Sequence, residues 1–551
     1  MDHGLPISSY RSHPLVLGII GRPDEATAAR FFDAAPGARL VTRADMLEMR
    51  AVGPVEARGT AGFHWGAALH TDGTPSTWQD VSEQLCAAGL SREVDYWVLF
   101  TDSLGVHSVY TRQLGDATFF STRQAPLIAL PGTLNVDWEA WASIFVMAAP
   151  LGAATPFSEI RRLEAASGVL IEHNGRHRPA SFTPRWLTES QGKLDADDIV
   201  EAVRAALPPR SALTRLPAVP LSGGWDSRLL AALAHETYLG RLTAWTTDPD
   251  DGRDLDIGYA ASVAETLGMA HQVVNNPNSG WPDLAAETRS RVEYETWLHP
   301  WFTPLCRRIR DVERDVLDGL GGDVLLKGLF VDDEVLDGGA DARLERLFTR
   351  LGYKPERLVG SLRKTVADAA IDICRQAFFE IGNRFSGHLN QLALAVLHSR
   401  TARVVALSPM SLLAPEVTPW LPFLGPQVLA ASLAVEPQRK TNGNLYRELL
   451  RSEAAAVAGL PSTNDFGQPP SDRSRQLIKG KEATTWMVGS ILANDSTSAM
   501  LDPSFASEMQ AGRGSWAQPD FRTTVFLQAA SLLSQWERRY RHRLSNTTPP
   551  W

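Results

Sequence analysis

Residues 221–227, with the sequence Leu-Ser-Gly-Gly-Trp-Asp-Ser, combine two hydroxyls, two glycines and a carboxylate in one short stretch. An apolar run precedes this stretch and a helix-like run follows it. A turn between a strand and a helix points free backbone N–H groups and the positive end of the helix dipole at an anion. Gly223 and Gly224 let the backbone approach that anion closely, and the hydroxyls of Ser222 and Ser227 add donors. The stretch therefore predicts a phosphate-binding loop, although a capped strand-to-helix turn would use similar residues.

Asp226 stands inside this loop. Its carboxylate would repel a bare phosphate, so its presence indicates a bridging cation, most simply Mg²⁺. A second string of the same character, Val-Leu-Asp-Gly-Leu-Gly-Gly-Asp, occupies residues 316–323. There, too, a short apolar run enters a glycine-rich turn that ends in a carboxylate, Asp323. A plain glycine-rich loop is the alternative for this second string taken alone.

Apolar runs and helical runs alternate around the first loop. The runs Leu216 to Leu221, Arg241 to Trp245 and His271 to Val274 predict three strands. Helical patterns follow the first strand at 228–234 and the second at 254–267. The order β-α-β-α-β predicts an α/β domain in which helices cover a parallel sheet and ligands bind at the carboxyl ends of the strands.

The first third of the chain has a different pattern. Leu15 to Ile20 and Tyr96 to Phe100 are short apolar runs that predict strands. The runs His107 to Thr111 and Ala117 to Ser121 flank a Gly-Asp turn and predict a hairpin, and Trp138 to Met147 has a helical pattern. Several short strands with turn signals and a helix predict an α+β sandwich.

The composition limits the classes of function. The 551 residues carry a formal net charge of −9, and a general nucleic-acid-binding surface needs a positive field, so we expect no nucleic-acid partner. The cysteines, Cys86, Cys306 and Cys374, are too widely spaced for a metal motif or a disulfide framework. The first residues show no secretion signal, and no apolar run reaches the ~20 residues of a membrane span. We therefore expect a cytoplasmic protein without a membrane span.

The 221–227 loop resembles the pyrophosphate-binding loop of the ATP pyrophosphatase families, which cleave ATP between its α and β phosphates. Residues 316–323 are similar to the second glycine-rich turn of the asparagine synthetase superfamily, whose final Asp is a Mg²⁺ ligand. The resemblance implies an adenine nucleotide α-hydrolase-like domain that uses ATP and Mg²⁺. It implies that Asp226 and Asp323 are catalytic and clamp Mg²⁺ on the β and γ phosphates. The implied ATP- and pyrophosphate-binding residues are Ser222, Gly223, Gly224, Asp226, Ser227, Arg228 and Gly319.

Within that set, Arg228 would be an extra cation for phosphate. A solvent-exposed helix arginine is the alternative.

Two strings in the first third resemble the glutaminase domain of asparagine synthetases. They are residues 100–110, continuing to 120–122, and residues 155–163, which look like the segment that closes that domain. Those glutaminases expose an N-terminal cysteine whose thiolate attacks glutamine. Here position 2 is Asp2 and the nearest cysteine is Cys86, so we expect a degenerate Ntn-glutaminase-like sandwich without a nucleophile. The predicted domains are residues 1–185 for this sandwich and residues 195–545 for the asparagine synthetase-like domain.

Two departures from the superfamily concern the acyl acceptor. Leu320 stands where asparagine synthetases carry a Glu and β-lactam synthetases a Tyr that helps to deprotonate the attacking amine. Residues 459–466, Gly-Leu-Pro-Ser-Thr-Asn-Asp-Phe, hold no lysine, whereas both families place one near this point to stabilise the acyl-adenylate. Together with Ser-Gly-Gly-Trp-Asp-Ser-Arg and Asp-Gly-Leu-Gly-Gly-Asp, this ending resembles the lasso peptide cyclases.

That resemblance implies an ATP-dependent, AMP-forming amide ligase of antibiotic biosynthesis. Lasso peptide cyclases adenylate an Asp or Glu side chain of a precursor (core) peptide, and the peptide's own α-amine then closes a macrolactam ring. A leader peptidase and a leader-binding protein are the further implied partners. A β-lactam synthetase or another small-molecule amide ligase of the superfamily is the alternative enzyme. A peptide-binding scaffold for a partner protease is the alternative outside the enzymes.

Three further features bear on the site. Glu293 and Glu295 fall where the superfamily keeps an acidic residue facing the nucleotide site, and a carboxylate there could orient the amine or accept its proton. Glu293 is the third catalytic candidate, with a solvated helix face as the alternative. His299 is interpreted as a structural histidine. Residues 415–424, rich in Pro and Trp, resemble the family's substrate-side loop and would suit an extended peptide.

Overall fold

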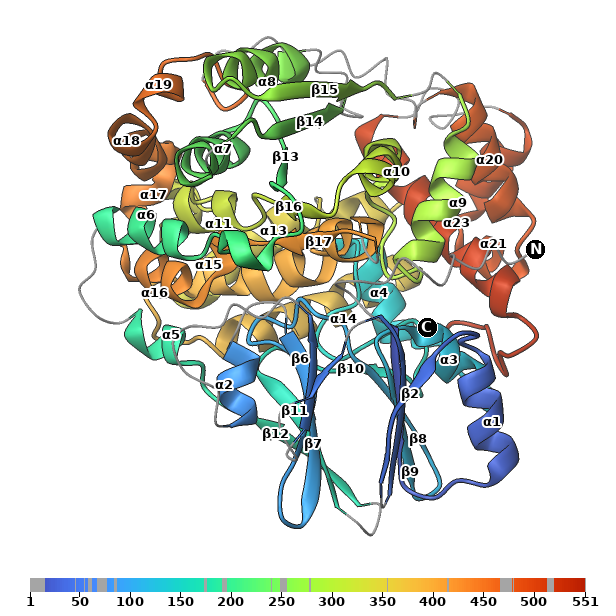
Figure 1. Ribbon diagram of the computed structural model, residues 1–551. Coiled ribbons are helices and arrows are strands. Elements are labelled where there is room, and N and C mark those ends of the chain that lie inside the picture. The colour runs from blue at the N-terminus through green and yellow to red at the C-terminus, as the bar shows by residue number, and fades with distance from the viewer. Residues whose placement is uncertain are drawn as a thin grey trace.

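The computed structural model describes residues 15–550 except positions 45, 54, 58–61, 67–76, 84–86, 173–175, 191–195, 239, 248–254, 277–278, 354, 414–415, 466–477, 479 and 513–519. Two six-stranded antiparallel sheets build its N-terminal part (Figure 1). In spatial order, the first sheet contains β10 (Arg161–Arg162), β8 (Tyr110–Leu114), β9 (Ala117–Ser121), β1 (Leu15–Ile20), β3 (Leu47–Val52) and β2 (Arg39–Ala44). The second contains β12 (His177–Ser181), β11 (Ser167–Glu172), β7 (Tyr96–Phe100), β6 (Ala87–Arg92), β5 (Gly62–Gly66) and β4 (Glu56–Ala57).

Alternate side chains of β1 belong to two different cores. Val16 and Ile20 pack between the sheets, in a cluster that contains Trp65 of β5 and Leu99 of β7. Leu17 belongs instead to the larger core shared with helices α1 (Glu25–Asp33) and α3 (Gln124–Ala129). Because successive strand residues point to opposite faces, a strand covered on both sides is apolar at consecutive positions. The strands predicted at 15–20, 96–100 and 117–121 are confirmed. The predicted hairpin is present, but its first strand runs over Tyr110–Leu114 rather than from His107 to Thr111.

Helix α4 (Trp138–Met147) joins the N-terminal part to the rest of the molecule. Asp137 caps its start by accepting the N–H of Ala140 at 2.9 Å, and its residues 140–147 are all buried. One side packs against α14 (Lys364–Asn383), and the ring of Trp141 lies 5.2 Å from that of Trp536 in α23 (Phe521–Tyr540). The last long helix therefore returns to the N-terminal part.

The second part of the chain contains a five-stranded sheet whose neighbouring strands are all parallel. The fold is therefore mixed, with antiparallel sheets followed by a parallel one, as the sequence predicted for a two-domain layout. In spatial order the strands are β15 (Ala270–Val274), β14 (Thr243–Thr247), β13 (Ala218–Pro220), β16 (Asp315–Leu317) and β17 (Thr418–Trp420).

One prediction for this part is wrong. Residues 415–424 do not form a substrate-side surface loop in the described part of that segment. Residues 418–420 form the edge strand β17, and Leu421, Phe423 and Leu424 are buried. Pro419 is compatible with that strand because an edge strand has one side without ladder hydrogen bonds.

Helices surround this sheet (Figure 1). The remaining α-helices are α2 (Trp78–Glu83), α5 (Arg185–Glu189), α6 (Ala196–Ala205), α7 (Trp225–Thr237), α8 (Leu255–Thr266), α9 (Trp281–Arg291), α10 (Thr303–Val312), α11 (Gly322–Leu326), α12 (Asp333–Leu336), α13 (Ala340–Leu351), α15 (Gln391–Val396), α16 (Pro426–Ala434), α17 (Pro437–Lys440), α18 (Asn444–Glu453), α19 (Ala455–Ala458), α20 (Lys481–Leu492), α21 (Asp495–Met500) and α22 (Pro503–Gln510). Two π-helical segments are η4 (Leu397–Val405) and η5 (Ser408–Leu413). The 3₁₀ turns are η1 (Arg210–Ala212), η2 (Pro300–Phe302), η3 (Pro355–Leu358), η6 (Pro422–Leu424) and η7 (Thr441–Gly443).

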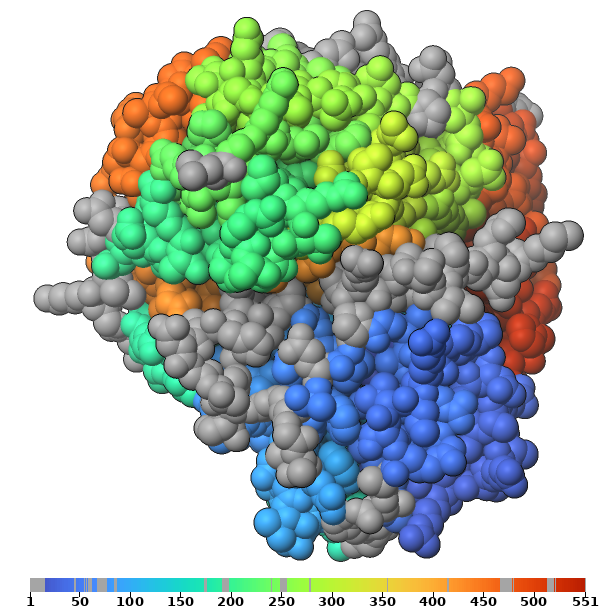
Figure 2. Space-filling model, viewed as in Figure 1, coloured from blue at the N-terminus to red at the C-terminus, as the bar shows by residue number. Residues whose placement is uncertain are grey.

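The two parts form a lower and an upper lobe on the face shown in Figure 2. The N-terminal strands make up the lower lobe, and residues of the parallel-sheet part make up the upper one. Among the helices that the structure describes, none combines the length and the apolar character needed to cross a bilayer.

Candidate active site

The 221–227 loop and the 318–323 turn meet at the carboxyl edge of the parallel sheet. Because β13 and β16 are parallel neighbours, the segments that follow them leave the sheet side by side. They border a cavity of about 440 Å³. Of the residues singled out from the sequence, those that line this cavity are Ser222, Asp226, Ser227, Gly319, Asp323 and His299.

Ser222 and Ser227 form hydrogen bonds within the 221–227 loop. The Ser222 N–H donates to Ser227 Oγ at 3.0 Å, and the Gly224 N–H donates to Ser222 Oγ at 3.2 Å. The two hydroxyl oxygens lie 3.1 Å apart. Helix α7 begins directly after the loop, and its N-cap residue Gly224 has no side chain to cap it. The positive end of the α7 dipole therefore lies at the cavity, where it favours an anion.

A distant segment, residues 462–464, holds the loop from the other side. The carbonyl of Gly223 accepts the Thr463 N–H at 3.0 Å and the Ser462 hydroxyl at 2.9 Å. The Trp225 N–H donates to Asn464 Oδ1 at 3.0 Å. These residues belong to the lysine-free 459–466 segment, whose described contacts are with the loop backbone. Sequence reasoning did not assign them this positioning role.

Asp256 is another site residue that the sequence did not reveal. Its Oδ1 accepts the N–H of Gly223, and its side chain lines the cavity. A Cβ on Gly223 would lie 2.7 Å from that oxygen and 2.8 Å from Thr463 Cγ2. Real Cβ atoms essentially never come this close, so glycine is required where α8 and the 462–464 segment close on the loop.

Asp226 and Asp323 form a half-buried acidic pair that lines the cavity. Burial raises the pKa of Asp226, and the charge of Asp323 raises it further. Burial also raises the pKa of Asp323, while the ammonium of Lys327 favours the charged form of both carboxyls. Oδ1 of Asp226 is buried and has no hydrogen-bond partner. Gly322 permits this approach, because a Cβ there would lie 2.7 Å from Asp226 Oδ1.

This pair fits a hard divalent cation. Two facing carboxylates and an unsatisfied oxygen are the donor set with which Mg²⁺ is held beside substrate phosphates. Among the described residues, no cluster of three or more His, Cys, Asp and Glu side chains could hold a metal ion alone. Asp226 and Asp323 would therefore share the cation with nucleotide oxygens and water.

The titratable groups in the described lining are four carboxylates and one histidine. Asp318 joins the three carboxylates already named, and burial raises its pKa to about 6. His299 Nε2 donates to the carbonyl of Val404 at 3.1 Å, and burial lowers the pKa of this histidine to about 4. The described lining contains no lysine or arginine. A polyphosphate entering this acidic cavity needs accompanying cations.

The apolar side of the cavity is aromatic. Trp301 and Phe302 line it with their rings 5.2 Å apart, and Trp245 from the middle of β14 also lines it. Val405 and Ser408 add residues from the π-helical segments η4 and η5. Because π-helical turns are rare and often lie at functional sites, their presence here supports a functional cavity.

Arg228 does not lie where a phosphate ligand is needed. The side chain is fully buried, and its guanidinium donates to the carbonyls of Val457, Leu460 and Pro461 at 3.2, 2.6 and 2.6 Å. The structure therefore corrects both sequence interpretations, the phosphate-binding cation and the exposed helix arginine. The α7 stretch from Ser227 to Ala234 is buried, so position 228 has a buried environment on this helix.

Glu293 also lies away from the cavity. It sits in a left-handed turn after α9, with φ 52°, and its Oε1 accepts the N–H of Gln124 at 2.7 Å. The carboxylate thus caps α3 of the N-terminal part, next to the Arg123 guanidinium at 3.5 Å. Glu295 is completely buried and pairs with Arg162 at 3.1 Å. These two carboxylates connect the two parts of the chain, which contradicts the predicted position of Glu293 at the nucleotide site.

Leu320 is buried in the large core and is not among the residues that line the cavity. Gly223 and Gly224 belong to the loop backbone rather than to the lining. The residues at positions 2 and 86 of the sequence predict that the glutaminase-like sandwich has no nucleophile. Both Asp2 and Cys86 lie outside the described residues.

Residues 201–463 match the family model of asparagine synthase. The matched segment contains both the 221–227 loop and the 318–323 turn. A comparison with curated proteins found no match. The chain therefore carries an asparagine synthetase-like domain, which supports an ATP-dependent amide ligase.

Proposed function

We propose that this asparagine synthetase-like chain is a peptide macrolactam synthetase of the lasso cyclase type. It adenylates the side-chain carboxylate of an Asp or Glu in a precursor peptide and joins that carboxyl to the peptide's N-terminal amine. AMP and pyrophosphate are released. The observation that carries the proposal is the charge of the cavity wall, whose described residues include four carboxylates and no lysine or arginine.

A free amino acid would bring an α-carboxylate into this cavity. Such a charge needs a cationic or hydrogen-bonding partner when it leaves water, and the described lining offers no cation for it. An Asp or Glu within a peptide brings only the carboxylate that reacts, because its α-carboxyl is part of an amide bond. Trp301 and Phe302 offer apolar surface to the rest of a peptide. The lining therefore favours a peptide over a free amino acid.

The 221–227 loop and the acidic pair act on ATP. Ser222 and Ser227 line the cavity beside the start of α7, where their hydroxyls would contact the leaving pyrophosphate. Mg²⁺ bound by Asp226 and Asp323 would neutralise the β and γ phosphates. Asp256 and residues 462–464 act through the loop, because they hold its backbone in place.

The reaction then has two balanced steps. An oxygen of the peptide carboxylate bonds to the α phosphorus while the bond from that phosphorus to the β-phosphate oxygen breaks. The peptide amine next bonds to the acyl carbon, and AMP leaves with one oxygen of the original carboxylate while the amine loses a proton. Holding the amine beside the adenylate supplies much of the rate, since proximity can contribute about 7–11 kcal/mol.

We propose that the N-terminal sandwich is a degenerate glutaminase-like domain that does not supply ammonia. Among the cysteines that the structure describes, Cys306 and Cys374 are buried, and burial raises the pKa of both thiols. Buried thiols held in the neutral form are poor nucleophiles. In this proposal the peptide's own amine is the nitrogen donor.

A mass-spectrometric assay tests the proposal. The full chain is incubated with ATP, Mg²⁺ and a synthetic linear precursor peptide. The expected product is lighter than the peptide by one water and forms together with one equivalent of AMP. Asp323→Asn should abolish the product, while the control Asp341→Asn, which changes an exposed carboxylate on α13, should not.

Three results would contradict the proposal. Turnover of a small β-amino acid without any peptide would favour a β-lactam synthetase-like reaction. Peptide binding without nucleotide dependence, with no product in any variant, would favour a scaffold. ADP as the nucleotide product would exclude adenylation.

A further inference from the structure

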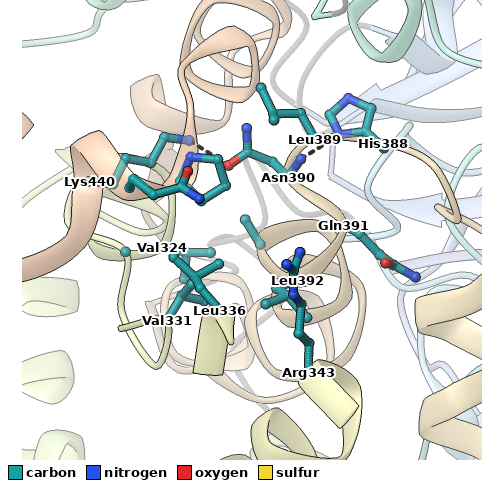
Figure 3. Close-up of a pocket in the computed structure, with 14 residues that line it drawn as sticks. Val324, Val331, Leu336, Arg343, His388, Leu389, Asn390, Gln391, Leu392 and Lys440 are labelled. Atoms are coloured by element: carbon teal, nitrogen blue, oxygen red, sulfur yellow. Dashed lines mark hydrogen bonds between the residues drawn. The ribbon is translucent and has the colours of Figure 1, made fainter. Parts of the chain in front are cut away.

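A second cavity adjoins helix α11 (Figure 3). Helix α11 contributes Asp323 to the candidate active site and Val324 to this second cavity. The other walls come from α13, from residues 388–393 and from α17. Its volume is about 100 Å³. A single water needs about 10–15 Å³, so the cavity has room for a small molecule.

Two cations reach this cavity from different elements. Lys440 of α17 is only 2% exposed, and its Nζ donates one hydrogen bond, to Asn390 Oδ1 at 3.0 Å. Arg343 of α13 enters from another side, as Figure 3 shows, and its buried Nε has no partner. Among the described residues, no ion pair or side-chain hydrogen bond satisfies the Arg343 guanidinium. The described lining contains no Asp or Glu.

Asn390 and His388, which also line the cavity, already have hydrogen-bond partners. Asn390 Nδ2 donates to the carbonyls of Leu433 and Val435 at 2.7 and 2.8 Å, so its Oδ1 is fixed toward Lys440. His388 Nδ1 accepts the Asn390 N–H at 3.0 Å, which leaves the proton on Nε2, 2.8 Å from the Ser190 hydroxyl. The cationic side chains that line the described part of the cavity, Lys440 and Arg343, therefore both retain unused N–H donors.

A buried ammonium without a counter-charge is costly to keep, and the half-buried Arg343 adds a second positive charge to the same cavity. Burial lowers the pKa of Lys440 to about 7, and no neighbouring carboxylate opposes that change. An anion in the cavity would supply the missing charge and accept the unused N–H groups.

We infer that this cavity is a binding site for a small organic carboxylate, which Lys440 and Arg343 hold by its two oxygens. The opposite walls are apolar, since Val324, Val331 and Leu336 line them. A carbon skeleton suits those walls, whereas a phosphate would place charged oxygens against them. Leu389 is 52% exposed and lines the cavity, so the ligand can enter from the surface there. The site is separate from the ATP cavity and does not depend on the proposed function.

Propionate is the probe for this site, and ligand-observed NMR on the full chain without nucleotide is the measurement. The structure predicts saturable binding that Lys440→Met and Arg343→Met each weaken at least tenfold. The matched controls are Arg439→Met and Arg346→Met, which change neighbouring arginines that bind Glu448 and the Asp337 carbonyl. Both controls should keep the wild-type dissociation constant. Thermal melts verify that each variant is folded.

Absence of saturable propionate binding to the folded wild-type chain would overturn the inference. Binding that neither Lys440→Met nor Arg343→Met weakens would overturn it as well. If inorganic phosphate bound in a Lys440-dependent way and propionate did not, the carboxylate assignment would be wrong. If Lys440→Met fails to fold, the test rests on the propionate affinities of Arg343→Met and its control Arg346→Met. Equal affinities of these two variants would overturn the inference.

Discussion

Asn464 Oδ1 accepts the backbone N–H of Trp225, the first residue of α7, at 3.0 Å across 239 positions of sequence. The asparagine side chain thus performs the capping role that Gly224 cannot. The Ser462 hydroxyl donates to the Gly223 carbonyl at 2.9 Å. Residues 462–464, at the end of the segment that matches asparagine synthase, therefore help to hold the 221–227 loop near its beginning.

Asn464→Ala should weaken both the fold and the affinity for ATP. Loss of a side-chain cap lowers the free energy of unfolding by about 1 kcal/mol. Because the loop backbone is displaced, the KM for ATP should rise several-fold more than kcat falls. Asn464→Asp keeps an acceptor oxygen and should melt like the wild type. Equal melting temperatures for the wild type and Asn464→Ala, with unchanged KM, would show that this contact does not position the loop.

Asp226→Asn should lower kcat by two or more orders of magnitude without lowering the melting temperature. The substitution removes one anionic ligand from the proposed Mg²⁺ site, and a hard cation depends on such ligands. It also removes a carboxylate whose ionisation the neighbouring charge of Asp323 opposes. Steady-state rates at several Mg²⁺ concentrations, compared with thermal melts, make the test. A melting temperature below that of the wild type would contradict the assignment. A wild-type kcat at the Mg²⁺ concentration that the wild type requires would contradict it as well.

Arg228→Met should act on stability rather than on phosphate binding. Its guanidinium satisfies three carbonyls between residues 457 and 461, and leaving such groups unsatisfied costs about 1–3 kcal/mol each. Urea denaturation should show a loss of about 2 kcal/mol or more. Below its melting transition, the variant should keep a KM for ATP close to that of the wild type. A large rise in that KM with wild-type stability would restore the phosphate role.

The sequence predicts the sheet and the position of its loops because those features are local. The apolar runs at β13, β14 and β15 and the glycine-rich turns after β13 and β16 each leave a pattern within a few residues. Parallel neighbours then bring the turns together without further information.

The partners of the site are not local, and the sequence does not reveal them. Asp256 and Asn464 bind the 221–227 loop through hydrogen bonds over 33 and 239 positions, which leave no periodic signal. Glu293 is directed toward α3 by a left-handed backbone turn that a carboxylate in a helical pattern does not predict. Arg228 is misassigned for a different reason, because a helix buried on all sides shows no polar face.

Lys440 should make stability depend on pH above neutrality. Its pKa is about 7 in the folded chain and lies near 10.5 in the unfolded chain. Between these values the unfolded chain binds a proton that the folded chain does not, so stability falls as the pH is lowered, by about 1.4 kcal/mol per pH unit. Below pH 7 there is no further loss from this group.

Lys440→Met removes that titration. In carboxylate-free buffer, the difference in unfolding free energy between the variant and the wild type should grow from pH 10 toward pH 7, in favour of the variant. Urea denaturation across this range measures it, with Arg439→Met as the control. A constant difference would show that Lys440 stays charged in the folded chain.

Oxygen transfer from the peptide to AMP tests the central claim most directly. A precursor peptide carrying ¹⁸O in the side-chain carboxyl of its acceptor Asp or Glu is incubated with the full chain, ATP and Mg²⁺. Adenylation predicts that each macrolactam formed is accompanied by one AMP containing one ¹⁸O atom. Unlabelled AMP, or ADP with labelled phosphate, would contradict the account.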